Sequence, residues 1–163
     1  MSIKTNETDR KIPVVFLICW QGDYPWYLPY FLHSCRYNPD IDFLIFTDNQ
    51  TSLTHLPHNV RLIPYSLEQF KTDAAKALGF EVAIEFGYKL CDFKPAYGFI
   101  FSDYIKKYDF WGYCDIDVIF GNIRLFMTDE CQHLRKNKFT RMHSNFNVFM
   151  WKNSKITNTQ IKS

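Results

Sequence analysis

Two aspartates spaced two residues apart, Asp115 and Asp117, offer the clearest chemistry in this chain. They follow the apolar residues 110–114 and precede the apolar residues 118–121. Where a chain leaves a sheet, two such carboxylates can converge on one Mg²⁺ or Mn²⁺ ion and leave coordination positions free for phosphate oxygens. Because an unpaired buried charge is costly, we expect both carboxylates to be buried with a metal as their partner. A structural turn is the alternative.

The spacing alone is weak evidence, because twelve aspartates in 163 residues give about one such pair by chance. A second pair, Asp40 and Asp42, has the same spacing but precedes a predicted strand and follows Asn38 and Pro39. We interpret this pair as a solvated turn. Sequence context therefore singles out Asp115 and Asp117.

Four β-branched and aromatic segments are predicted as strands that would hold these residues: 12–20, 41–46, 60–63 and 110–114. Between them, helices are predicted from Asp23 or Pro25 to residue 37, with Pro29 leaving the start open, and from Ser66 to residue 78. A third, continuous helix is predicted from residue 95 or 96 to Lys107. This alternation predicts an α/β fold with a mainly parallel sheet, which binds ligands at the carboxyl ends of its strands.

Composition narrows the class of protein. The chain is 47% hydrophobic with a formal net charge of +2 and scattered basic residues, so we expect one domain and no nucleic-acid partner. Five cysteines without a C-x-x-C motif suggest neither a disulfide framework nor a zinc site. The boundaries predict a polar extension over 1–11, a domain over 12–153 and a frayed tail over 154–163.

Localisation is predicted from the absence of apolar targeting segments. Residues 1–11 are polar, and the longest apolar run, 12–20, is too short to cross a bilayer. We therefore expect a cytoplasmic protein, with the inner face of the membrane as an alternative place of work.

Two segments carry a resemblance to a known family. Residues 88–98 read Tyr-Lys-Leu-Cys-Asp-Phe-Lys-Pro-Ala-Tyr-Gly, and residues 108–121 read Tyr-Asp-Phe-Trp-Gly-Tyr-Cys-Asp-Ile-Asp-Val-Ile-Phe-Gly. Together they resemble the bacterial DUF6625-type family of predicted glycosyltransferases, associated with capsule and lipopolysaccharide synthesis. They resemble, more distantly, the DxD regions of other GT-A enzymes. The resemblance covers roughly residues 11–141.

The resemblance implies a GT-A fold, a Mn²⁺ or Mg²⁺ ion and a nucleotide-sugar donor, with UDP-sugar as the expected class. It implies Asp117 as the direct metal ligand and Asp115 as a metal, ribose or metal-bound-water contact. The other implied donor-site residues are Cys19, Trp20, Gln21, Thr47, Asp48, Asn49, Lys89, Asp92 and Lys94. Among these, Trp20 has a core position as its alternative, Asp48 a turn cap, and Lys89 and Lys94 a solvated position.

The implied function is metal-dependent transfer of a sugar to a surface-glycan or lipid-linked acceptor, with possible peripheral membrane association. Family members are longer, and this chain stops soon after Trp151. Residues 139–143 resemble a family segment in which relatives have Gly in place of Met142, and residues 144–151 fit that pattern poorly. His143 in this segment is a metal or phosphate candidate, with an exposed loop position as its alternative. No residue is assigned as the catalytic base.

Two other functions stay open. One is a truncated, non-catalytic module that binds a nucleotide sugar or a partner subunit. The other is a haloacid-dehalogenase-type phosphatase with Asp115 as nucleophile and Asp117 as acid/base, although only 46 residues follow Asp117. The chain lacks G-x-G-x-x-G and G-x-x-x-x-G-K-[ST], which disfavours a dinucleotide-binding dehydrogenase and a P-loop NTPase.

Overall fold

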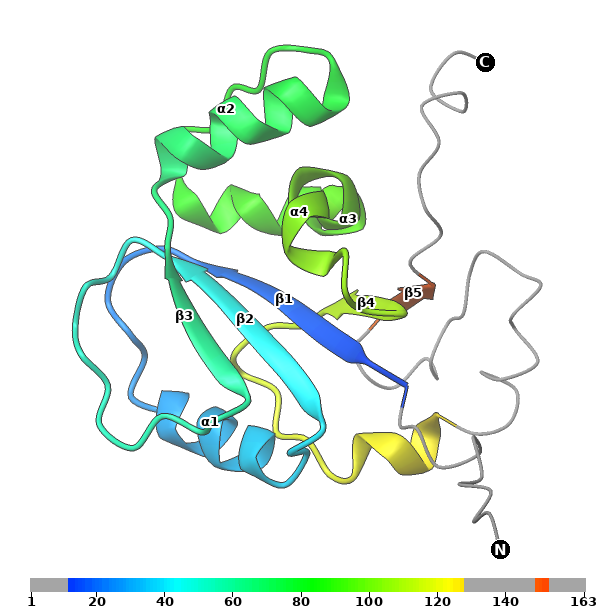
Figure 1. Cartoon of the computed structure of the whole chain (residues 1–163). Helices are drawn as coiled ribbons and strands as arrows, with labels where there is room; N and C mark the ends of the chain where they lie inside the picture. The colour runs from blue at the N-terminus through cyan, green and yellow to red at the C-terminus, as the bar shows by residue number, and fades with distance from the viewer. Residues whose placement is uncertain (1–11, 128–148, 153–163) are drawn as a thin grey trace, which may run out of the picture.

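A computed structural model describes residues 12–127 and 149–152 of the chain. Its centre is a five-stranded sheet in the order β3-β2-β1-β4-β5 (Figure 1). The four parallel strands are β1 (Val14–Trp20), β2 (Ile41–Thr47), β3 (Val60–Pro64) and β4 (Phe110–Tyr113), and β5 (Phe149–Lys152) runs antiparallel beside β4. The predicted α/β class with a mainly parallel sheet is confirmed, and the fold is Rossmann-like. β5 was not predicted.

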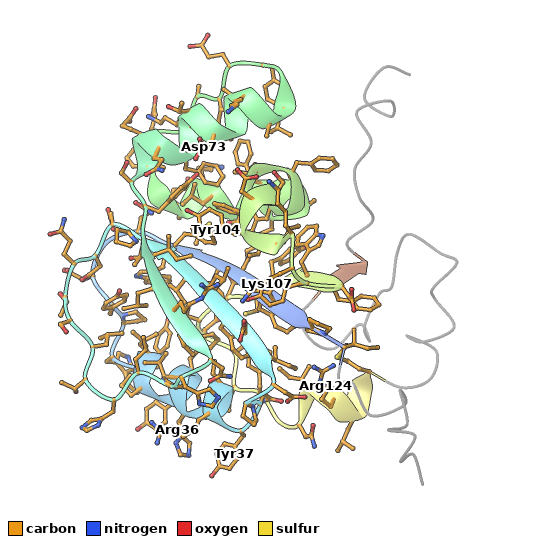
Figure 2. All side chains as sticks on the ribbon, viewed as in Figure 1. Arg36, Tyr37, Asp73, Tyr104, Lys107 and Arg124 are labelled. Carbon is orange, nitrogen blue, oxygen red and sulfur yellow. The ribbon has the colours of Figure 1, made fainter. Side chains whose placement is uncertain are left out.

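Helices cover both faces of the sheet, and the side chains of these layers fill the space against it (Figure 2). One face is covered by α1 (Leu28–Arg36) and by residues 116–123, and η3 (Ile123–Phe126) ends this layer. The other face is covered by α2 (Leu67–Leu78), η2 (Gly87–Ala96), α3 (Tyr97–Ile100) and α4 (Ser102–Ile105).

The central strand β1 explains why the sequence forms two layers. Val14, Phe16 and Ile18 contribute to the cluster under α1, whereas Val15 and Leu17 contribute to the cluster under α2 and α3. Each of these five side chains is at most 1% exposed. Successive side chains of a strand point to opposite faces, so a continuous apolar run serves both layers.

The first two helices follow the sequence signals to different degrees. α2 is confirmed: the Ser66 side chain accepts from the Gln69 N–H at 3.1 Å, and Gly79 ends the helix with a φ of 79°. α1 begins later than Asp23 or Pro25. Its start is fixed by Pro29 in the first turn, because proline lacks the N–H that a first-turn residue leaves unpaired anyway.

The predicted continuous helix up to Lys107 is wrong, because this segment is divided between η2, α3 and α4. Packing against the sheet explains the break. Gly98 lies so close to Trp111 that a Cβ there would be 2.2 Å from the ring, and Phe101 stacks on Phe46 at 4.0 Å between ring centroids. Phe101 has φ −102° and ψ 26°, outside the helical region, so burial of its ring overrides helical periodicity.

The interpretation of Asp40 and Asp42 as a solvated turn is also wrong. Asp42 lies within β2, where its carboxylate accepts a hydrogen bond from Tyr108. Asp40 accepts from Arg124 at 2.9 Å, and both aspartate side chains are no more than 34% exposed. Both carboxylates are bound to partners that lie more than sixty residues away in the chain, which no local pattern reveals.

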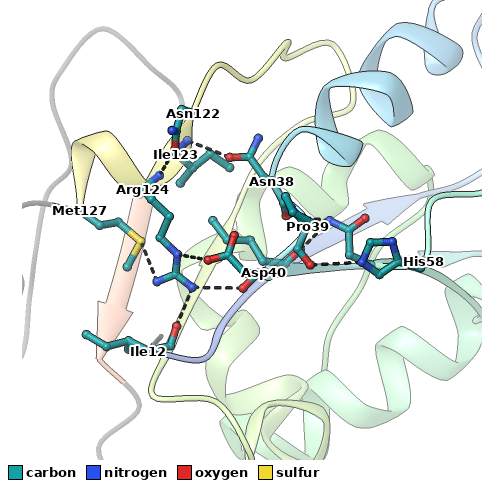
Figure 3. Close-up of polar contacts among 11 residues, drawn as sticks. Ile12, Asn38, Pro39, Asp40, His58, Asn122, Ile123, Arg124 and Met127 are labelled. Atoms are coloured by element: carbon teal, nitrogen blue, oxygen red, sulfur yellow. Dashed lines mark hydrogen bonds and ion pairs between the residues drawn. The ribbon is translucent and has the colours of Figure 1, made fainter. Parts of the chain in front are cut away.

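At the amino end of the sheet, a polar cluster fastens the segment that follows Asp117 (Figure 3). The buried Asn38 amide donates to the Gly121 carbonyl at 2.9 Å, and its oxygen accepts from the Ile123 N–H at 2.8 Å. Arg124 donates to the carbonyl oxygens of Ile12 and Asp40 at 2.7 and 3.1 Å. The cluster thus holds residues 121–124 at the amino end of the sheet.

The predicted extension over 1–11 and tail over 154–163 lie outside the described residues. Within the described part of the chain, none of the helices combines the length and the apolar character needed to cross a membrane.

Candidate functional site

The predicted site residues meet at the carboxyl edge of the sheet. β1 has β2 on one side and β4 on the other, with Trp20 in register with Thr47 and Leu17 in register with Tyr113. Strands β2 and β3 are added on one side of β1 and strand β4 on the other, so the strand order changes direction at β1. In parallel sheets, ligands bind at the carboxyl edge beside such a switch point. Residues that follow β1, β2 and β4 are brought to one edge.

An ion pair lies at the end of β4. Lys94 Nζ is 2.5 and 2.6 Å from the two carboxylate oxygens of Asp115, and it also lies 5.8 Å from the ring centroid of Tyr113. The lysine side chain is 17% exposed and the aspartate side chain 45%. Lys94 comes from η2, which packs against the end of β1, so the pair joins two elements 21 residues apart. The pair thus places a cation at the end of β4.

The expectation that Asp115 and Asp117 are both buried is wrong. Asp115 is half-buried and Asp117 is exposed, while the intervening Ile116 is 2% exposed and packs under α1. Ile116 anchors the turn in the core under α1, and its two acidic neighbours lie closer to the surface. Asp115 therefore takes Lys94 as its partner, and Asp117 is solvated.

This donor set can be compared with what a divalent ion needs. The described residues contain no group of three or more His, Cys, Asp or Glu side chains placed to hold a metal. Mg²⁺ and Mn²⁺ are commonly bound by only one or two carboxylates, with phosphate and water oxygens completing the shell. Asp115 and Asp117 fit such a shared site and not a cage built by the protein alone.

The loops after β1 and β2 are tied to each other. The Gly22 N–H donates to Asp48 at 2.7 Å, and the Asn49 side-chain amide donates to the Gly22 carbonyl at 3.0 Å. Gly22 has a φ of 89°, a conformation that favours glycine. Asp48 thus joins two loops, which differs from the predicted alternative of a cap on the turn that follows it, and Asn49 still exposes part of its side chain at this edge.

The end of β1 also contacts η2. A Cβ added to Gly87 would lie 2.6 Å from Gln21 Cβ, so only glycine fits at this crossing. The Gln21 amide donates to the Tyr65 carbonyl at 3.1 Å, and its buried oxygen has no hydrogen-bond partner among the described residues. Gln21 therefore positions η2 and keeps one acceptor unused.

Cys19 is a neutral group at this edge. Burial raises the pKa of its thiol to about 12, against smaller lowering effects of Tyr97 and Lys94. The Tyr97 hydroxyl donates to the Leu90 carbonyl at 3.0 Å, and its pKa is raised well above the ordinary value, chiefly by burial. Cys19 is not a thiolate nucleophile at neutral pH.

The remaining predicted residues lie at the edge with local partners. Trp20 is half-buried and its indole N–H donates to the Asp23 carbonyl at 3.0 Å. Thr47 is 1% exposed and its hydroxyl accepts from the Asn49 N–H at 3.1 Å. Lys89 and Asp92 form an exposed pair at 3.6 Å within η2, separate from the pair between Lys94 and Asp115.

Three residues at this edge were not predicted. They are Tyr113 beside Lys94, Gly22 between the β1 and β2 loops, and Tyr24, whose pKa is raised by burial and then by the nearby Asp48. Gly22 directly after a predicted strand was a usable signal for a tight turn. The two tyrosines gave none, because their roles depend on neighbours far away in sequence.

His143 and the segment 139–143 lie outside the described residues. Comparison with known proteins gives one match: a family model described as a family of unknown function, DUF6625, matches residues 16–163. No curated protein and no solved structure matches the chain.

Proposed function

Because this chain belongs to the DUF6625 family, whose function is unknown, we propose its function from the site: metal-dependent transfer of a sugar from a nucleoside diphosphate donor. UDP-sugar is the expected donor class, and a surface glycan or a lipid-linked glycan is the acceptor. The observation that carries the proposal is the ion pair of Lys94 with Asp115 at the carboxyl edge where β1 and β4 adjoin, with the exposed Asp117 two residues further along the chain.

The charges of the site support a diphosphate ligand. Asp115 and Asp117 supply two oxygen ligands for a Mg²⁺ or Mn²⁺ ion, which when bound offsets negative charge on a diphosphate leaving group. Lys94 supplies a fixed positive charge beside them, and a charged donor strengthens a hydrogen bond to phosphate. In the proposed complex, Lys94 shifts part of its contact from Asp115 to a phosphate oxygen, which frees the carboxylate.

The neighbouring loops support a nucleoside beside the diphosphate. Asn49 offers a polar side chain at the end of β2, and Trp20 offers an aromatic wall at the end of β1. Such sites combine apolar walls with a few fixed polar groups. Gly22, Asp48 and Asn49 hold the two loops together, so these groups are positioned before a ligand arrives.

The test is calorimetric titration of UDP into the purified chain, first with Mn²⁺ and then with EDTA. We expect binding that needs Mn²⁺. Asp117→Ala should lower UDP affinity at least about tenfold, because loss of a charged ligand removes one of only two protein contacts to the ion. Thermal unfolding should be unchanged, since Asp117 is exposed.

Asp103→Ala is the matched control. Asp103 is also an exposed aspartate, and its partner is Lys106, three residues further along the chain, instead of a residue of the candidate site. UDP binding should survive that change. Metal-independent binding, or equal affinity in the Asp117 variant, would contradict the metal site. Binding followed by no transfer or hydrolysis of any UDP-sugar would favour the non-catalytic module, and release of inorganic phosphate from a phosphomonoester would favour the phosphatase.

A further inference from the structure

The outer side of α1 carries aromatic side chains instead of charged ones. Tyr30 and His33 lie within α1, Trp26 lies in the turn before it and Tyr37 is its C-cap residue. The four are spaced by four, three and four residues, which is the spacing of residues on one side of a helix. Trp26, Tyr30 and Tyr37 are 81%, 58% and 69% exposed. Trp26 meets Tyr30 edge-on at 6.2 Å between centroids, and His33 meets Tyr37 at 5.1 Å. We call these four residues the aromatic stripe.

The opposite side of α1 already belongs to the core. Leu28, Phe31 and Cys35 are at most 2% exposed and pack against β1 and β2. A helix at a protein surface normally buries one apolar side and turns charged residues to water. Because the aromatic stripe is exposed and lies outside the core cluster under α1, it indicates a contact surface.

The charge around the stripe selects the partner. Neither α1 nor the loop 50–59 contains a carboxylate. Arg36 links the helix to this loop by donating to the His55 carbonyl at 3.2 Å. Figure 2 shows Arg36 and Tyr37 on the side of α1 that faces away from the sheet. His33 and His58 add two further exposed nitrogen bases. Asp40, just beyond the helix, is paired with Arg124.

We infer that this face docks reversibly on an anionic lipid bilayer, with the aromatic stripe at the level of the headgroups and Arg36 against lipid phosphates. Trp and Tyr have apolar bodies and polar tips, which match the boundary between acyl chains and headgroups. A basic side chain without competing carboxylates is attracted to anionic lipid. Helix α1 follows the loop that leaves the end of β1, so docking holds the candidate site beside the lipid surface.

The inference can be tested without nucleotide or metal, so its outcome is independent of the proposed glycosyl transfer. The chain is floated with vesicles of phosphatidylcholine alone and of phosphatidylcholine mixed with phosphatidylglycerol. We expect binding to the anionic vesicles only. Replacing Trp26 and Tyr30 with Ser should lower partitioning about tenfold or more, since binding scales with the apolar area inserted. Arg36→Gln should lower it about fivefold, because one basic residue near an anionic surface contributes that much.

The matched control replaces Phe86 and Tyr88 with Ser, which removes two rings of similar exposure, 60% and 68%, from the opposite layer of the molecule. Its partitioning should equal that of the unchanged chain. Absence of vesicle binding, or an equal loss in the control, would overturn the inference. A dimer detected by light scattering would also overturn it, if the dimer needs Trp26 and Tyr30 and the protein does not bind vesicles. The aromatic stripe would then contact a second copy of the chain.

Discussion

At the scale of single residues, variants of the two lysines of η2, Lys89 and Lys94, can show which of them contacts the phosphate of the donor. Lys94 contacts Asp115 and is mostly buried, whereas Lys89 pairs with Asp92, lies 5.3 Å from the Tyr88 ring centroid and is 49% exposed. Replacing Lys94 with Met should lower UDP affinity in Mn²⁺ about tenfold, because a charge-assisted contact to phosphate is lost. The free energy of unfolding should fall by about 1 kcal/mol or less, since Asp115 is half exposed and solvent screens the pair.

Calorimetry and urea unfolding of both variants measure these effects. Lys89→Met should leave both quantities near those of the unchanged chain. If the two variants bind UDP equally well, Lys94 is only a partner of Asp115 and not a donor contact.

The residue types of the site could be predicted, but their environment could not. The motif around Asp115 and Asp117 and the position of Lys94 were visible in the sequence, and the structure brings Lys94 and Asp115 together. The expected burial of the aspartates was wrong because flanking apolar residues reveal only that the turn is anchored. Ile116 fills that anchoring role and leaves its neighbours at the surface.

At the scale of elements, the polar cluster at the amino end of the sheet determines how firmly residues 121–124 are held. Asn38→Ala should lower the free energy of unfolding by about 2 to 3 kcal/mol, because the buried Ile123 N–H and Gly121 carbonyl lose their partner. Urea unfolding monitored by circular dichroism measures this loss.

Asn122→Ala is the control within the same cluster. The Asn122 side chain only accepts from the Arg124 N–H at 3.1 Å in an exposed turn, so its loss should cost about 1 kcal/mol or less. Equal losses in the two variants would show that Asn38 does not fasten the segment.

Strands were predicted better than helices because a strand buried on both faces has an unbroken apolar sequence. All four parallel strands were located to within two residues at each end. The segment before Lys107 looked like one helix by periodicity, and only the contact of Gly98 with Trp111 and of Phe101 with Phe46 breaks it. These contacts join residues more than ten positions apart.

At the scale of the whole molecule, buried thiols predict how stability depends on pH. Burial raises the pKa of Cys19 from an ordinary 9.0 to about 12, and burial likewise raises the pKa values of Cys35 and Cys114. The thiols then stay protonated in the folded state while they ionise in the unfolded state. The contribution of these thiols to stability is fully present below pH 9.0. As the pH rises toward the folded-state pKa values, the free energy of unfolding falls by about 1.4 kcal/mol per pH unit for each thiol.

Urea unfolding in the presence of a reductant, between about pH 8 and 10.5, measures this dependence. Cys19→Ala should make the free energy of unfolding fall less steeply with pH, because one thiol fewer is ionised on unfolding. A free energy of unfolding that stays constant over this range would contradict the burial of the thiols.

The sequence by itself determined the α/β class, the parallel strands and the acidic turn after the fourth of them, because local apolar runs and turn residues carry that information. Only the tertiary structure decided that Asp115 pairs with Lys94, that the loops of Gly22 and Asp48 are joined, and that α1 presents an aromatic outer face. These features depend on which strands become neighbours and which side of a helix meets the sheet. Both are set by the packing of distant segments. The spacing of the aromatic residues is visible in the sequence, but that packing decides that they face away from the sheet.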